Sequence, residues 1–171
     1  WMQSAYQAEF QAKNTLVSCG GKHGLLMALQ AVLESNDEAI IIAPYWVSYP
    51  TMVTMVGGTP KIIYTSAEEG WKVKPEQIEA ACSGRTKVLI LNNAANPTGV
   101  IYNHDEIASI LQIVEKKNLI VISDEVYSGL VYGGQEYISC SSFPNHHDSV
   151  VIIQSVSKHF AMTGWRVGFV F

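Results

Sequence analysis

The sequence has few charged residues and no long apolar run, and each shortage excludes a class of protein. Charged residues make up 15% of the 171 residues, and the formal net charge is −4. This balance gives no basic footprint for binding nucleic acid or an anionic membrane. Apolar runs such as residues 119–122 are far too short to span a bilayer. The hydrophobic content of 48% in turn excludes extended disorder and predicts a globular chain with a buried core.

Cysteine is also scarce. Cys19, Cys82 and Cys140 are odd in number, and none lies in a CxxC pair or at a Cys/His spacing typical of metal sites. A disulfide framework and a zinc site are therefore not predicted. The three residues are interpreted as reduced thiols of a cytoplasmic protein.

Both ends of the sequence predict a fragment of a longer protein. Residues 1–3 carry no basic or apolar signal segment, and residues 167–171 have the pattern of a strand that stops at the last residue. No repeat, low-complexity tract or linker divides the chain. We therefore expect residues 1–171 to form one domain that is truncated at both ends.

β-branched apolar runs alternate with amphipathic stretches along the chain, which predicts an α/β fold with a mostly parallel sheet and helices on both faces. Its seven strands are expected at 15–19, 39–43, 61–65, 87–91, 120–123, 150–153 and 167–171. Its helices are expected at 24–34, 47–56, 75–81, 105–117 and 158–161, with Asn103 as the cap of the fourth. The last strand should be antiparallel, because residues 158–166 are too short a connection for a parallel crossover.

Polar clusters follow five of the predicted strands. They are Gly20-Gly21-Lys22-His23, Tyr45-Trp46, Asn92-Asn93, Asp124 and Ser155. Ligands of open α/β sheets bind at the carboxyl ends of the strands. The sequence therefore predicts one ligand site at that edge.

The densest cluster of reactive side chains lies between Ser155 and Gly168. Lys158 follows a buried strand, where desolvation would lower its pKa and free its amine for covalent chemistry. Arg166 offers a planar fork suited to a phosphate. Taken alone, a lysine in this setting is more often an ordinary surface residue.

Three motifs in order resemble those of class I aminotransferases, which depend on pyridoxal 5′-phosphate (PLP) and belong to fold-type I. The string SxSKxFxMTGWRxG at 155–168 is similar to the family's PLP-attachment signature, and NPTG at 96–99 and SDEVY at 123–127 also match. The resemblance covers nearly the whole chain. It implies that the chain is the large PLP-binding domain, without the small C-terminal domain, the N-terminal arm or the substrate α-carboxylate arginine. It also implies a homodimer for the full-length protein.

The resemblance assigns a role to each matched position. Lys158 would attach the cofactor and then act as the base that moves a proton. Asp124 would pair with the ring nitrogen, and Tyr127 and Asn96 would bind the phenolic oxygen of PLP. Trp46 would stack on the ring.

The phosphate of PLP is expected in the glycine turn. Gly21 and Lys22 open a helix whose free N–H groups attract anions. Ser155, Ser157 and Arg166 would complete this site. The family also holds the Asn96-Pro97 bond cis, so we expect a cis bond here.

Substrate choice depends mainly on Lys22. The strings GGKHGLLMAL and APYWVSYP resemble a bacterial-type aspartate aminotransferase subgroup, also found among prephenate aminotransferases. In that subgroup this lysine binds the distal carboxylate, and the substrate-binding set would be Lys22, Trp46 and Asn96. His23 departs from the subgroup's usual glutamine. The expected reaction is transamination between aspartate or glutamate and a 2-oxo acid, although this fragment by itself should not turn over.

Three alternatives stay open at this point. The chain resembles other fold-type I enzymes equally in its TGWR string, so a C–S lyase or another aminotransferase is possible. A PLP-sensing domain of a transcription regulator would share the same core. An inactive homologue is a third interpretation, although every cofactor position in the sequence is intact.

Overall fold

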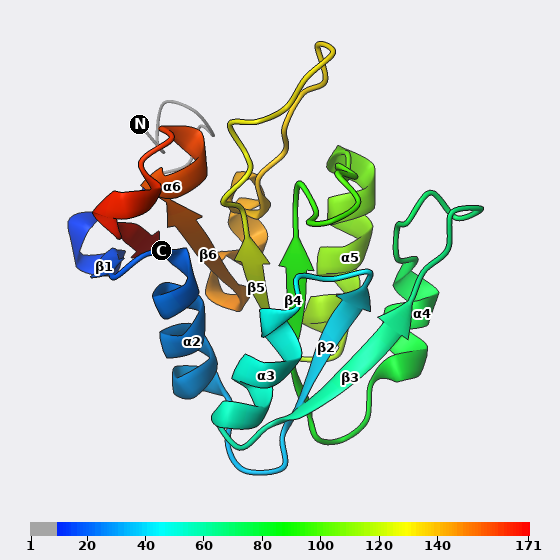
Figure 1. The fold of residues 1–171 in the computed structure, drawn as a ribbon. Helices are drawn as coiled ribbons and strands as arrows, with labels where there is room; N and C mark the ends of the chain where they lie inside the picture. Colours follow the sequence, from blue (N-terminus) through cyan, green and yellow to red (C-terminus); the bar gives the residue numbers. More distant parts are fainter. Residues whose placement is uncertain (1–9) are drawn as a thin grey trace.

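Seven strands form one sheet at the centre of the computed structural model, which describes residues 10–171 (Figure 1). The strands are β1 (Leu16–Ser18), β2 (Glu38–Ala43), β3 (Thr59–Tyr64), β4 (Thr86–Asn92), β5 (Ile120–Asp124), β6 (Val150–Ser155) and β7 (Gly168–Val170). Their order across the sheet is β1-β7-β6-β5-β4-β2-β3. Each one overlaps a strand predicted from the sequence, so the predicted α/β fold is confirmed.

The direction of β7 is also confirmed. It pairs antiparallel with both of its neighbours, β1 and β6, while the pairs among the other strands are parallel. Only a four-residue helix and one 3-10 turn separate β6 from β7. That path is too short for a crossover, so the chain turns back on itself.

Helices cover both faces of the sheet. On one face lie α2 (Gly21–Val32) and α3 (Ser48–Met55), and on the other lie α4 (Pro75–Ala81) and α5 (His104–Lys116). Consecutive strand residues face opposite layers: Ile40 packs with α4 and α5, and Ile41 packs with α2 and α3. Because each face of the sheet is covered by helices, consecutive residues in the middle of these strands are apolar.

Local capping explains where the helices begin. Asn103 caps α5 as predicted, since its side chain accepts a hydrogen bond from Glu106 N at 2.9 Å, and Asn103 N donates to the Glu106 carboxylate at 2.7 Å. Helix α2 begins at Gly21 rather than at residue 24, because Gly20 adopts φ +81° and turns the chain directly into the helix. Helix α6 (Val156–His159) begins two residues before its predicted start, because Ser155 caps it.

Four 3-10 turns complete the described chain: η1 (Ala12–Asn14), η2 (Cys140–Ser142), η3 (Pro144–Ser149) and η4 (Thr163–Trp165). The carboxyl ends of the parallel strands β2 to β6 meet at one edge of the sheet, at the top of Figure 1. That edge carries Asn92, Asp124 and Ser155, and it is where the candidate site lies.

Candidate active site

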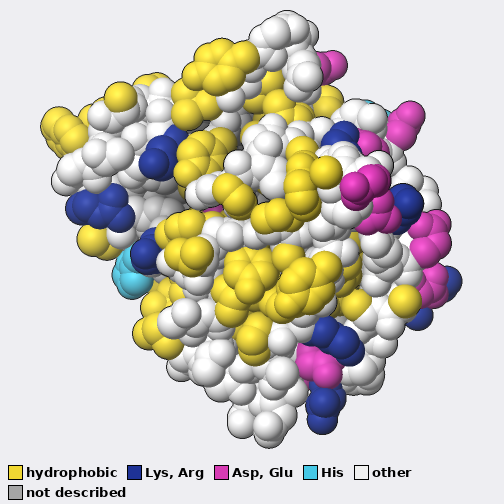
Figure 2. Space-filling model, turned by 45° about the vertical axis from the view of Figure 1, so that its right-hand side comes forward, with side chains coloured by type: hydrophobic (Ala, Val, Ile, Leu, Met, Phe, Trp, Pro, Cys, Tyr) yellow, Lys and Arg dark blue, Asp and Glu magenta, His cyan; other side chains and the backbone are white. Residues whose placement is uncertain are grey.

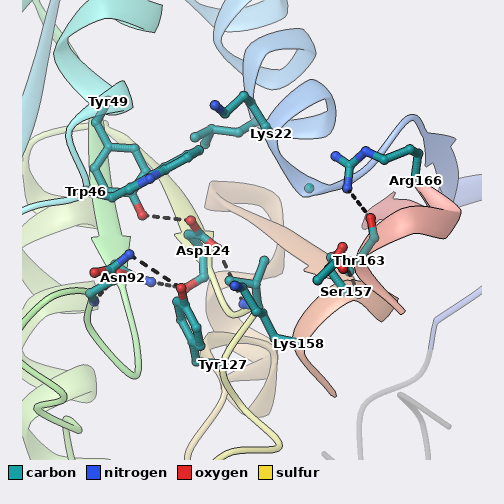
Figure 3. Close-up of a pocket in the computed structure, with 15 residues that line it drawn as sticks. Lys22, Trp46, Tyr49, Asn92, Asp124, Tyr127, Ser157, Lys158, Thr163 and Arg166 are labelled. Carbon is teal, nitrogen blue, oxygen red and sulfur yellow. Dashed lines mark hydrogen bonds between the residues drawn. The ribbon is translucent and has the colours of Figure 1, made fainter. Parts of the chain in front are cut away.

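A cavity of about 240 Å³ opens at the carboxyl edge of the sheet (Figure 3). All ten site residues predicted from the sequence line it: Gly21, Lys22, Trp46, Asn96, Asp124, Tyr127, Ser155, Ser157, Lys158 and Arg166. They come from the ends of β1, β2, β4, β5 and β6 and from the turn before β7. The predicted convergence of separate strand ends on one site is therefore confirmed.

Glycine is required where the first turn of α2 meets β7. Gly20 has φ +81°, and a Cβ there would overlap the Arg166 guanidinium. A Cβ on Gly168 would overlap the Gly20 carbonyl carbon and lie 2.6 Å from Gly21 N. The turn is therefore held between Arg166 and the backbone of β7. The first N–H groups of α2 open into the cavity beside Arg166, which is an arrangement that fits a phosphate.

Arg166 itself is fixed by its backbone and by one hydrogen bond. It occupies the left-handed region at φ +52°, and its Nη1 donates to Thr163 O at 2.9 Å. This turn brings the guanidinium next to Gly20, while the side chain stays exposed to solvent. Figure 3 shows Arg166 beside Thr163 at the edge of the cavity.

Asp124 lies at the base of the cavity, where its carboxylate accepts a 2.7 Å hydrogen bond from the Tyr49 hydroxyl. Burial raises the pKa of Asp124, while the bonds from Tyr49 and from Val126 N favour its charged form. Burial and the nearby carboxylate hold the pKa of Tyr49 well above its ordinary value. The Tyr49 phenol therefore stays protonated and acts as the donor to Asp124.

The sequence analysis missed Tyr49. One signal could have found it: Tyr49 follows Trp46 by only three residues, and the turn into α3, in which Tyr49 N donates to Trp46 O at 3.1 Å, brings the two rings together. The two ring centroids lie 5.5 Å apart in an edge-to-face arrangement. Trp46 and Tyr49 therefore form one wall of the cavity above Asp124 (Figure 3).

Asn92 is a second residue whose role the sequence analysis missed. Its amide donates to Asp124 O at 2.8 Å, and its Oδ1 accepts from Asn96 N at 2.7 Å. Asn92 thus joins the ends of β4 and β5 to the segment that carries Asn96. The Asn96-Pro97 bond is cis, as predicted. Asn96 Nδ2 lies 3.4 Å from the Tyr127 hydroxyl, which brings these two predicted site residues together.

The neighbouring Asn93 faces away from the cavity. It is buried, its amide donates to Ile138 O at 3.0 Å, and its Oδ1 accepts from Tyr102 N at 3.0 Å. Of the predicted polar pair at the end of β4, only Asn92 therefore faces the site.

Lys158 lies on α6 at the rim of the cavity, with Nζ 5.7 Å from the centre of the Tyr127 ring. Ser155 begins this helix by accepting a hydrogen bond from Ser157 N at 3.0 Å. The expectation that Lys158 is desolvated is wrong for this chain, since the residue is exposed. The reason is that α6 is a single turn beyond the end of β6, where the cavity is open to solvent.

Lys22 lies across the cavity from Lys158. Its Nζ is 4.7 Å from the centre of the Trp46 ring, a cation–π distance. His23, the next residue, does not line the cavity; its Nδ1 accepts a hydrogen bond from Cys19 N at 3.3 Å. It therefore braces the glycine turn from outside.

The charge of the cavity is predominantly positive. Among the described residues that line it, Lys22, Lys158 and Arg166 are basic and Asp124 is acidic. Figure 2 shows basic side chains around a hollow on one side of the molecule, while acidic side chains gather mostly on the other. The cavity thus suits a ligand with several negative charges and one group that pairs with a carboxylate.

Neither a metal site nor a membrane-spanning helix is found within residues 10–171. No group of three or more His, Cys, Asp or Glu side chains is arranged to hold a metal ion. No helix in this part of the chain is long and apolar enough to cross a membrane. Cys19, Cys82 and Cys140 are all free thiols, as predicted.

Comparison with known proteins gives a consistent family. The family model described as aminotransferase class I and II matches residues 1–171. The chain is 38% identical over 164 residues to an aspartate aminotransferase of Bacillus sp. (strain YM-2), which covers 95% of this chain and 42% of the relative. It is 37% identical over 157 residues to the aspartate/prephenate aminotransferase of Thermus thermophilus, covering 92% of this chain and 40% of the relative. The chain thus spans about two fifths of the length of these relatives.

Solved structures agree with this family. An aspartate aminotransferase from Thermus thermophilus with maleate matches with a TM-score of 0.92 at 35% identity, covering 99% of this chain and 44% of that one. An aromatic aminotransferase from Pyrococcus horikoshii OT3 matches with a TM-score of 0.95 at 32% identity, covering 99% and 46%.

Proposed function

Because the chain belongs to the class I and II aminotransferase family, we propose that it forms the PLP-binding domain of an enzyme that transfers an amino group from a dicarboxylic amino acid to a 2-oxo acid. One observation carries the proposal: Lys158, Asp124 and the cradle of Gly20 and Arg166 converge on one cavity. A lysine, a buried carboxylate and an anion site are the three groups that PLP requires.

The residues present fit PLP. The glycine turn leaves backbone N–H groups free, and the absence of a Cβ on Gly20 lets the Arg166 cation approach them, so this corner would hold the phosphate. Ser155 and Ser157 lie beside it. Trp46 offers a ring face on which the pyridine would stack. When bound, PLP supplies an electron sink for the bond-breaking step.

The chain's own groups would orient the cofactor and handle protons. Asp124, bonded to Tyr49, would hold a proton on the ring nitrogen. Asn96 and Tyr127 would donate hydrogen bonds to the phenolic oxygen. Lys158, at the open rim, would attach the cofactor through Nζ and then carry a proton between donor and acceptor carbons.

Lys22 supports a dicarboxylic substrate. Its ammonium lies 4.7 Å from the centre of the Trp46 ring, in a cavity that already contains Arg166 and Lys158 for other anions. A second carboxylate on the substrate would form an ion pair with the Lys22 ammonium. The likeness to an aromatic aminotransferase makes an aromatic donor the alternative to be tested.

Further parts of the proposal concern the full-length protein. We propose that it is a cytoplasmic homodimer, with amino and 2-oxo acids as its partners and with neither nucleic acid nor membrane bound. Residues 1–171 would be the large domain, and the small domain and N-terminal arm would lie outside this chain. Three free thiols and a net charge of −4 are consistent with that location.

The deciding experiment is covalent trapping of PLP on the full-length protein. Borohydride reduction should fix PLP on the wild type and on a Lys87→Ala control, whose lysine is exposed and outside the cavity. Lys158→Ala should trap none. Trapping on the Lys158→Ala protein would refute the assignment of this lysine.

Donor specificity is tested by Lys22→Ala. A charged hydrogen bond contributes roughly 1.5–3 kcal/mol, so kcat/KM for aspartate should fall about ten- to hundredfold while phenylalanine is nearly unaffected. Equal losses for both donors at saturating PLP would mean that Lys22 serves the cofactor alone.

A further inference from the structure

Glu125 is a fully buried carboxyl group directly next to Asp124, and the proposed reaction gives it no role. Because side chains alternate at the end of β5, Asp124 faces the cavity and Glu125 faces the opposite side of the sheet. Its Oε1 accepts hydrogen bonds from Ser123 Oγ and from Cys140 N, both at 3.0 Å. Among residues 10–171, its Oε2 has no hydrogen bond of good geometry, although the Ser139 and Tyr137 hydroxyls lie close to the carboxyl group.

The backbone of Glu125 is held as firmly as its side chain. Its N–H donates to Ile153 O at 3.0 Å on β6. Its carbonyl accepts from Ser128 N at 3.0 Å and from Gln154 Nε2 at 2.8 Å. Glu125 therefore joins β5, β6 and the segment at Cys140. The turn that it fixes, residues 124–128, carries Asp124 and Tyr127 into the cavity.

The environment of Glu125 favours its neutral form. Burial raises the pKa of Glu125 to about 7, although the hydroxyl of Ser139, the N–H of Cys140 and the hydroxyl of Ser123 favour the charged form. Within residues 10–171, the titratable groups that act on it are the Cys140 thiol and the Tyr137 phenol, and neither is a cation. A buried anion with no cation beside it is unfavourable.

We propose that Glu125 is a positioning residue that, as a neutral acid, fixes the turn bearing Asp124 and Tyr127. The two adjacent acids thus have different tasks: the outer one faces the cofactor ring and the inner one holds the backbone. The effect of Glu125 on PLP binding rests on the proposed function, whereas the first test below, which measures stability without PLP, does not.

The first test measures the stability of the full-length protein without PLP, for the wild type and Glu125→Gln, between pH 4.5 and 8. A carboxyl whose pKa is raised on folding stabilises the protein most below its unfolded value, and that contribution is lost as the pH rises towards 7. The denaturant midpoint of the wild type should therefore fall relative to Glu125→Gln across this range. Glu136→Gln, which removes an exposed acid and keeps Glu125, should instead follow the wild type across this pH range. A constant difference between wild type and Glu125→Gln at every pH would overturn the neutral acid.

The second test measures PLP binding to the full-length protein by the absorbance of the bound cofactor. Glu125→Gln keeps the acceptor for Ser123 and Cys140, so its Kd should stay within about twofold of wild type. Glu125→Asp is one methylene too short to reach both donors and should weaken binding roughly tenfold, as expected for the loss of one hydrogen bond to a buried group. Glu125→Asp is used instead of Glu125→Ala because it keeps a carboxyl group and is therefore less disruptive to folding. Equal PLP affinity and equal pH dependence of the bound-cofactor spectrum in Glu125→Gln and Glu125→Asp would overturn the positioning role. Failure of the wild type to bind PLP would instead refute the proposed function and leave the first test valid.

Discussion

Replacing Gly168 by alanine should damage the candidate site without touching any reactive side chain. Gly168 lies in β7 between Ser18 of β1 and Ser155 of β6, and it packs directly on the Gly20–Gly21 peptide. The new Cβ would lie 2.6 Å from Gly21 N and 2.8 Å from Gly20 O. To restore ordinary contact at 3.4 Å, the Gly21 backbone must move by roughly 0.8 Å.

The magnitude of this effect follows from what the methyl group meets. Overpacking of a buried position destabilises a protein by about 1–3 kcal/mol, and the upper part of this range applies because backbone atoms cannot rotate away. The displaced peptide also carries N–H groups that would hold the phosphate. Weakening one charged hydrogen bond by roughly 1.5–3 kcal/mol should reduce PLP affinity about ten- to hundredfold.

Chemical denaturation and PLP titration of the full-length protein measure the two effects separately. Gly164→Ala is the matched control: a Cβ there meets nothing within 4 Å, so its stability should stay within about 0.5 kcal/mol of wild type. If Gly168→Ala unfolds at the wild-type midpoint and binds PLP with unchanged affinity, the close packing of β7 on the glycine turn does not hold the site.

Two further predictions concern single hydrogen-bond networks. Tyr49→Phe removes the 2.7 Å bond to Asp124, so the pKa of Asp124 should rise further and kcat/KM should fall about tenfold or more with PLP affinity little changed; an unaltered pH–rate profile would contradict this. Glu38 accepts hydrogen bonds from Ser83 at 2.6 Å and Thr86 at 2.8 Å, which with the nearby cations lower its pKa to about 2. Its stabilisation is therefore present above pH 4.5 and is lost as the pH falls towards 2. Glu38→Gln should destabilise the protein by about 1–3 kcal/mol at pH 7 and by less near pH 3, as measured by urea unfolding; a loss that does not depend on pH would argue against the charged network.

The centre of the sheet was predictable from the sequence because β2, β4, β5 and β6 are mostly apolar runs that are largely buried. Even the reversal of β7 followed from the length of the connection before it. The starts of α2 and α6 were not predictable in the same way, since Gly20 and Ser155 act through backbone geometry and a local cap. Intrinsic propensity treats glycine as a helix breaker and cannot anticipate such a turn.

The site residues that belong to a sequence motif were predictable. Residues that join the site through contacts between distant parts of the sequence were not. Tyr49 meets Asp124 across 75 positions of the sequence, and nothing in either local pattern announces that bond. Asn92 likewise bonds Asp124 across 32 positions. The exposure of Lys158 escaped prediction because it depends on how far α6 extends beyond the sheet. Long-range contacts between elements, rather than local chemistry, define what the sequence analysis missed.

The position of β7 has a consequence for the order in which the molecule assembles. In the described sheet, β1 has no strand neighbour other than β7, so the glycine turn that follows β1 joins the sheet through the strand that comes last in the chain. During synthesis, residues 16–24 must wait until Arg166 and Gly168 have emerged, and contacts of such large sequence separation form slowly. The anion cradle therefore cannot close before β7 is in place. A phosphate that binds only to the formed cradle would stabilise the folded domain relative to the unfolded chain.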